Sequence, residues 1–272
     1  MRGHHKIRMF ISEKICFIEL EKTGISSIKK FLKSHIKEGN ITRPHDNVTN
    51  ELLEKKLFFI GSIRNPLDWY ISRWSYGCMM KNDDSMYRNL IKKRLSHSRV
   101  KNINHQYIKK IKYFKNQLFK NSEYWSNLYS DPFNAKNFRE WLKAMLSSKK
   151  KDQLAEHYYF SSFYRNFGYM TFRYLVMFTN PDNRNQIFTN LKEYDDLLKF
   201  DKNYNFVNYF IKVENLKSDL DKLFKILNLE VVNKLEIVNP SKRNPDVDYY
   251  YNDECINLVK KYERFIFEKY EY

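Results

Sequence analysis

The sequence has 272 residues, enough for one large domain with a substantial buried core. Aromatic residues make up 17% of the chain, and there are only six Gly and six Pro, a composition that excludes an intrinsically disordered protein. The formal charge of +17 favours an anionic partner, but charge alone does not choose among nucleic acid, an anionic membrane, an anionic glycan and a multiply phosphorylated cofactor.

Cysteine and histidine spacing gives no sign of a metal centre or a disulfide framework. Cys16, Cys78 and Cys255 are odd in number and far apart, which predicts three reduced thiols in a reducing compartment. The seven His show no metal-ligand spacing, so we expect no metal. No apolar run reaches the length of a membrane span, and no signal-peptide core is present. We therefore expect no membrane span and a cytoplasmic location.

The first structural unit is a strand, a polar turn and a helix. Ile15–Ile18 form an apolar run typical of a buried strand, and apolar residues recur at helical spacing from Ile25 to Ile36. The turn between them contains Lys22 and Gly24 and leads into the helix N-terminus, where free N–H groups and the helix dipole attract anions. The candidate phosphate-binding residues here are Lys22, Thr23, Gly24, Ile25, Ser26 and Ser27.

A second unit of the same kind follows a linking segment, in which Asp46 or Asn47 is expected to cap a short helix. Leu57–Ile60 and Ile63 predict a strand, and Pro66 suits the first turn of a helix. Arg64 at the end of the strand and Ser72 on the helix suit a second phosphate, because a guanidinium fork and a hydroxyl both donate to phosphate oxygens. The alternative is a surface ion pair between Arg64 and Asp68, with Lys22 solvated.

Residues 78–160 are predicted to form a basic helical insertion within a single domain spanning 1–272. Residues 81–160 contain 18 Lys and Arg against 7 Asp and Glu. Two interpretations remain open: these residues cover a cofactor site and shape an acceptor site, or they are solvated helix faces. Interleaved aromatic and basic residues are also compatible with single-stranded nucleic acid, a minority interpretation, and no nucleic acid partner is expected.

The remaining pattern predicts strands at Tyr174–Phe178 and Tyr209–Val213, a helix after Glu214, and one final helix over Cys255–Phe267. A basic loop containing Lys242 and Arg243 precedes that helix, and a second phosphate needs cations that close over it after binding. Alternating strands and helices predict an α/β fold: a three-layer sandwich with a mainly parallel central sheet. Glu214, at a strand end, is expected to fix a loop or a helix start rather than contact a substrate.

Taken together, these stretches resemble the sulfotransferases that use 3'-phosphoadenosine 5'-phosphosulfate (PAPS), and among them the carbohydrate type. Glu21-Lys-Thr-Gly-Ile-Ser-Ser27 is similar to their Pro-Lys-Thr-Gly-Gly/Ser-Thr-Ser loop. Arg64-Asn-Pro-x-Asp-x-x-x-Ser72 is similar to their 3'-phosphate motif, and Asn239-x-Ser-x-Arg243 to their C-terminal loop. The strand followed by Glu214-Asn-Leu matches as well. The resemblance implies a topology akin to P-loop kinases and covers the chain outside the insertion.

The resemblance also implies a function and residue roles. The protein would transfer the sulfuryl group of PAPS to a hydroxyl, or alternatively an amine, of an acceptor such as a glycan, without a metal and leaving adenosine 3',5'-bisphosphate. Lys22 would be catalytic, and the loop residues with Arg64, Ser72, Ser241 and Arg243 would bind the cofactor. His45 would be the catalytic base, with a structural loop histidine as the alternative, and the ordinary pKa of histidine suits proton abstraction near neutral pH. His97, His105 and His157 are reserve candidates.

Two departures keep other functions open. Glu21 places a carboxylate beside a polyanion site, and Ile25 replaces a small residue at the helix entrance. A homologue that binds nucleotide or glycan without turnover is therefore an alternative. A small-molecule kinase of similar fold is another, although Lys22 precedes Gly24 and no GxxxxGK[ST] motif is present.

Overall fold

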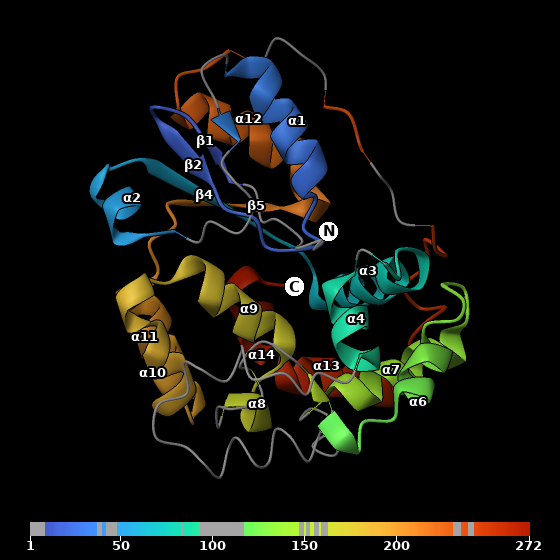
Figure 1. Ribbon diagram of the computed structural model, residues 1–272. Helices are drawn as coiled ribbons and strands as arrows, with labels where there is room; N and C mark the ends of the chain where they lie inside the picture. Colours follow the sequence, from blue (N-terminus) through green and yellow to red (C-terminus); the bar gives the residue numbers. More distant parts are fainter. Residues whose placement is uncertain are drawn as a thin grey trace.

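The structure is a computed structural model that describes residues 9–36, 40–41, 48–82, 84–92, 117–146, 150, 153–154, 158, 163–230, 235–238 and 242–272. These residues form an α/β fold around one sheet of five strands in the order β3-β1-β2-β4-β5 (Figure 1). The strands are β1 (Phe10–Ile11), β2 (Ile15–Phe17), β3 (Asn40–Ile41), β4 (Phe58–Ile63) and β5 (Tyr209–Lys212).

The sheet is mixed rather than mainly parallel. β2, β4 and β5 are parallel, in a register that pairs Phe17 with Ile60 and Ile60 with Tyr209. β1 pairs antiparallel with β2 along one of its edges and with β3 along the other. The three parallel strands match the runs that the sequence predicts at Ile15–Ile18, Leu57–Ile63 and Tyr209–Val213. Their carboxyl ends lie at one edge, where ligands bind in open α/β sheets.

Helices cover both faces of the sheet (Figure 1). On one face, alternate strand residues such as Phe17 and Ile60 pack against α1 and α12 in one apolar cluster. On the other face, Cys16, Phe59 and Ile63 belong to a larger cluster with α3, α7, α9 and α13. This alternation follows from the two-residue repeat of a strand that is buried on both faces.

The described helices extend the fold well beyond the sheet. Those before β5 are α1 (Ile25–His35), α2 (Asn50–Glu54), α3 (Pro66–Met79), α4 (Ser85–Ile91), α6 (Ser122–Leu128), α7 (Ala135–Leu146), α8 (Phe163–Asn166), α9 (Tyr169–Phe178), α10 (Arg184–Thr189) and α11 (Tyr194–Tyr204). Those after it are α12 (Leu216–Ile226), α13 (Asp253–Tyr262) and α14 (Arg264–Tyr270), and short 3-10 helices lie at Pro181–Asn183 and Val213–Asn215. The described part of the expected insertion is helical, and its α7 packs against α3 and α13.

Three local predictions are wrong. Tyr174–Phe178 is the second half of helix α9 and not a strand, because the apolar run begins at Tyr169 and is buried nearly all around the helix. The final helix is two helices, α13 and α14, divided at Glu263, whose buried carboxylate bonds to the start of α9. α2 is capped by Thr49 rather than by Asp46 or Asn47, since its hydroxyl accepts from Leu52 N at 3.3 Å.

All three cysteines are free, and all three are buried. Burial raises the pKa of Cys16 to about 12 and also raises that of Cys78 and Cys255, so these thiols are unreactive. In the part of the chain that the structure describes, no helix is long and apolar enough to cross a bilayer. The same residues contain no group of three or more His, Cys, Asp or Glu side chains placed to hold a metal ion.

Candidate functional site

The loop between β2 and α1 is a tight turn with two residues at positive φ. Lys22 has a φ of 66° and Gly24, the N-cap of α1, has a φ of 73°. A Cβ at Gly24 would meet nothing closer than Val213 at 3.6 Å, so the backbone angle, not space, favours glycine. Within the described residues no side chain caps α1, and its first turn contains no acidic residue. These N–H groups lie where the sequence predicts an anion.

The three hydroxyls of this loop have different surroundings. Thr23 is fully buried: its hydroxyl donates to Leu20 O at 2.5 Å and lies 2.6 Å from the hydroxyl of Ser62 on β4. Ser27 Oγ accepts from Val238 N at 2.9 Å, and Ser26 is exposed. The side chains of Thr23 and Ser27 therefore hold the loop in place, and Ser26 offers the hydroxyl that faces solvent.

Lys22 is not a solvated loop residue. Its Nζ lies 3.7 Å from the centre of the Tyr76 ring on α3, a cation–π contact. Burial lowers the pKa of Lys22 to about 7, helped by the positive charge of Arg73, while Asp84 acts in the opposite direction. Arg73 and Asp84 form a buried ion pair with an N–O distance of 2.8 Å. The ammonium group is thus held against α3 in surroundings that favour its neutral form.

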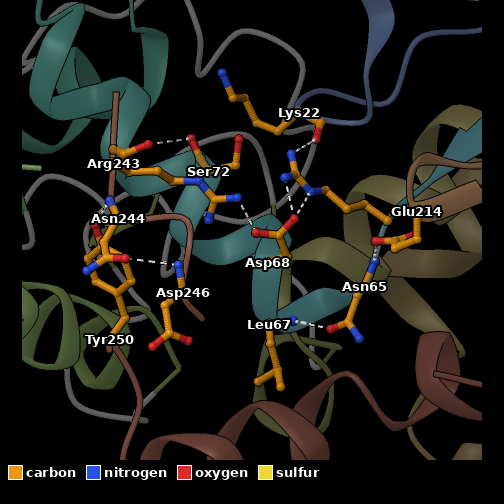
Figure 2. A network of polar contacts seen from close by, with 12 residues as sticks. Lys22, Asn65, Leu67, Asp68, Ser72, Glu214, Arg243, Asn244, Asp246 and Tyr250 are labelled. Atoms are coloured by element: carbon orange, nitrogen blue, oxygen red, sulfur yellow. Dashed lines mark hydrogen bonds and ion pairs between the residues drawn. The ribbon is translucent and has the colours of Figure 1, made fainter. Parts of the chain in front are cut away.

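Asp68 pairs with both Arg64 and Arg243, and we call these three residues the Asp68 cluster. Figure 2 labels Asp68 and Arg243. Arg64 Nε donates to Asp68 Oδ2 at 2.5 Å, its Nη2 pairs with the same oxygen, and its Nη1 donates to Lys22 O at 3.2 Å. Arg243 Nη2 pairs with Asp68 Oδ1. Arg243 Nη1 is buried and has no hydrogen-bond partner among the described residues. One carboxylate therefore connects the strand-end arginine to the arginine of the C-terminal loop.

The Arg64–Asp68 pair that the alternative predicted is present, but it is not a simple surface pair. The side chains of Arg64 and Arg243 are 15% and 11% exposed, and the pair is shared with a third residue. Ser72 lies one turn beyond Asp68 on the same face of α3 and is buried. The structure therefore brings Arg64, Ser72 and Arg243 to one region around Asp68.

Two tyrosines hold the C-terminal loop in this position. Tyr250 OH accepts from Asn244 N at 3.0 Å and donates to Pro132 O at 2.7 Å. Tyr251 OH donates to Leu67 O, in the first turn of α3, at 2.8 Å. The loop carrying Arg243 is thus fixed to α3 and to the turn before α7.

Glu21, the departure before Lys22, is paired with Arg173 of α9. Arg173 Nε donates to Glu21 Oε1 at 2.9 Å, and Nη2 donates to Oε2 at 3.3 Å. The backbone oxygen of Glu21 accepts from Trp69 Nε1 at 2.7 Å. The carboxylate that seemed to oppose a polyanion site is therefore matched by a guanidinium group.

Glu214 fixes a loop, in line with the interpretation that the sequence favoured. Its Oε1 accepts from Asn65 N at 2.7 Å, and its Oε2 accepts from Tyr272 OH at 2.9 Å. Asn65 in turn caps α3, since its Oδ1 accepts from Leu67 N at 2.9 Å. Glu214, just after β5, thereby fixes the position of the backbone that follows Arg64.

Several candidates lie outside the described residues, namely His45, Ser241, His97, His105 and His157. Sequence reasoning missed the contributions of Arg73, Tyr76 and Arg173. Tyr76 lies four positions after Ser72 on α3, and that spacing was a usable signal, whereas Arg73, at the position next to Ser72, faces another direction. Arg173 gave none, because it comes just before the segment predicted to be a strand and lies 152 positions from Glu21.

Comparisons with protein-family models, with curated proteins and with solved structures find no match to this chain.

Proposed function

We propose that this protein transfers the sulfuryl group of PAPS to a hydroxyl group of an acceptor, with an amine as the alternative nucleophile and a glycan as the first acceptor class to test. The topology akin to P-loop kinases is part of this proposal. So is a cytoplasmic location, which three free buried cysteines favour because thiols persist in a reducing compartment.

One observation carries the proposal: the two phosphate motifs meet. Lys22 and Arg64 are 42 positions apart, and Arg64 Nη1 donates to Lys22 O at 3.2 Å. Arg243, from the far end of the chain, joins them through Asp68. A nucleoside with phosphates on both the 3' and the 5' oxygen of its ribose needs two separate anion sites at a fixed separation. ATP does not, because its phosphates form one chain at the 5' position. The convergence at the ends of β2 and β4 therefore favours a 3',5'-bisphosphate.

The residues present suit in-line transfer, in which positioning and charge stabilisation dominate. The N–H groups at the start of α1, with Ser26, would hold the 5'-phosphosulfate. Arg64, Ser72 and Arg243 would hold the 3'-phosphate. The acceptor oxygen would form a bond to sulfur as the bond from sulfur to the 5'-phosphate oxygen breaks, and His45 would take the acceptor proton. Protonated Lys22 would stabilise the charge that grows on the leaving oxygen.

The first test is thermal unfolding with adenosine 3',5'-bisphosphate, ADP and ATP at equal concentrations. A rise in Tm that is selective for the bisphosphate is expected, because a ligand that binds only the folded state stabilises it. A larger rise with ATP would favour a kinase instead. No rise with any of them would remove the proposal.

Turnover then separates an enzyme from a binding protein. We expect release of adenosine 3',5'-bisphosphate from PAPS in the presence of an acceptor pool of glycans. Lys22→Ala should abolish this release while far-ultraviolet circular dichroism stays unchanged. Selective binding without any release across hydroxyl and amine acceptors would indicate a protein that binds the nucleotide but does not turn it over.

A further inference from the structure

We propose that Arg173 is a positioning residue that neutralises Glu21 and so lets a Glu-Lys-Thr-Gly loop accept a polyanion. This inference rests on the proposed anion site at Lys22, and it adds a residue from a different helix to that site. It predicts that Glu21 does not weaken the site as long as Arg173 is present.

The contact has the geometry of a specific pair. The guanidinium of Arg173 uses Nε and Nη2 on the two oxygens of one carboxylate, at 2.9 and 3.3 Å. Fork contacts of this kind fix orientation as well as charge. The Arg173 side chain is 13% exposed and that of Glu21 is 27% exposed, so water screens the pair only partly. The Trp69 indole holds the backbone of Glu21 at the same time.

Glu21 acts electrostatically on the rest of the site. Its negative charge raises the pKa of both Lys22 and Arg73, so both groups lie within range of this carboxylate. An anion bound at Lys22 would lie within range of it as well and would be repelled. With Arg173 in place the pair is formally neutral, and the repulsion is largely cancelled.

A purely mechanical role gives different expectations. If the Glu21–Arg173 pair only tied the loop to α9, then loss of either partner would disturb the loop, and both single variants would bind the anion more weakly. If the pair balances charge, the two single variants have opposite effects. Arg173→Gln leaves the Glu21 carboxylate without this guanidinium partner beside the anion, whereas Glu21→Gln removes a negative charge from beside the anion and keeps the Arg173 guanidinium.

The experiment is a double-mutant cycle with Glu21→Gln, Arg173→Gln and the double variant. Binding of adenosine 3',5'-bisphosphate and, separately, of inorganic pyrophosphate is measured by calorimetry at low ionic strength. Arg264→Gln is the matched control. It removes the same charge from an exposed pair with Glu268, whose oxygen lies 2.5 Å from Arg264 Nε. Thermal unfolding checks that every variant is folded.

We expect Arg173→Gln to weaken binding about tenfold, Glu21→Gln to bind at least as tightly as the original protein, and the double variant to return to within about threefold of it. Arg264→Gln should change affinity less than twofold. The inference is overturned if Arg173→Gln stays within twofold of the original protein, or if both single variants weaken binding and the double variant does not recover.

Failure of the proposed function is a separate outcome. If the original protein binds pyrophosphate but shows no preference for the bisphosphate, the bisphosphate assignment fails and the pyrophosphate cycle still decides the role of Arg173. If it binds neither anion, both proposals fall.

Discussion

Binding of adenosine 3',5'-bisphosphate should draw a proton onto Lys22. In the free protein, burial beside Arg73 lowers the pKa of this ammonium from 10.5 to about 7. A phosphate dianion placed next to Lys22 favours the charged form and raises the pKa again. The bound protein then holds more protons than the free one, so affinity is highest below the free pKa and falls as pH rises above it.

The size of the effect follows from these values. At pH 8, one unit above the free pKa, about one-tenth of Lys22 is protonated without ligand. If the bound anion restores the ordinary pKa, binding takes up about 0.9 proton per ligand at this pH. The apparent Kd should weaken about tenfold for each pH unit above 7 until the pKa of the complex is reached. Phosphate monoesters titrate near pH 6, so the ligand itself contributes little in this range.

Calorimetry between pH 7.5 and 9 measures this linkage. Titrations in two buffers of different ionisation enthalpy give the number of protons taken up, and phosphate buffer is avoided because it competes for the site. Lys22→Met is the control and should bind more weakly with an affinity that is flat in pH. The reasoning is refuted if the Kd changes by less than threefold between pH 7.5 and 9 and binding takes up less than about 0.3 proton per ligand. An equal slope in Lys22→Met would assign the proton to another group.

Two further substitutions test the structure around the site. Asp68→Asn removes the charge that aligns Arg64 with Arg243. Calorimetry should show about tenfold weaker binding of the bisphosphate but less than threefold weaker binding of AMP. Equal losses of affinity for both ligands would contradict this role of Asp68. Gly168→Ala places a Cβ about 2.0 Å from Oε1 of the buried Glu263. Urea unfolding should show a loss of about 2–4 kcal/mol with the nucleotide affinity of the folded protein unchanged, and a loss below about 1 kcal/mol would contradict the packing argument.

The parts of the site that depend on local sequence could be predicted. A short apolar run, a polar turn and a helical repeat identify β2 with α1, and the same pattern with Pro66 at the helix start identifies β4 with α3. Because parallel strands end at one edge of the sheet, the convergence of Lys22 and Arg64 follows from these local patterns.

Helix α9 shows where the pattern is ambiguous. Tyr174–Phe178 is apolar at five consecutive positions, which suits a strand buried on both faces and equally a helix buried all round. Only length separates the two, and the ten residues from Tyr169, bounded by Gly168 and followed by Pro181, suit a helix better. The sequence therefore contained a length that favours a helix, but the five-residue apolar run within it suggested a strand instead.

The charge balance of the site could not be predicted, because each pair joins distant segments. Glu21 meets Arg173 across 152 positions, and Asp68 meets Arg243 across 175. Either carboxylate, read alone, argues against a polyanion. When it is paired, each carboxylate instead holds an arginine in a defined orientation and lowers the net positive charge of the site. A residue that departs from a motif can therefore be judged only with its spatial partner, which a single sequence does not reveal.

Because of these ion pairs, the formal charge of the site is much smaller than the overall charge of the protein. Among the described residues of the site are five cations and four carboxylates, a formal charge of +1: Lys22, Arg64, Arg73, Arg173 and Arg243 with Glu21, Asp68, Asp84 and Glu214. Adenosine 3',5'-bisphosphate has two phosphate groups, each with a charge of about −1.5 to −2 at neutral pH. In the proposed complex, the N–H groups of α1 and the Nη1 of Arg243 would therefore supply much of the attraction. Selectivity then depends on where these donors point, since the chain's +17 would attract any polyanion alike.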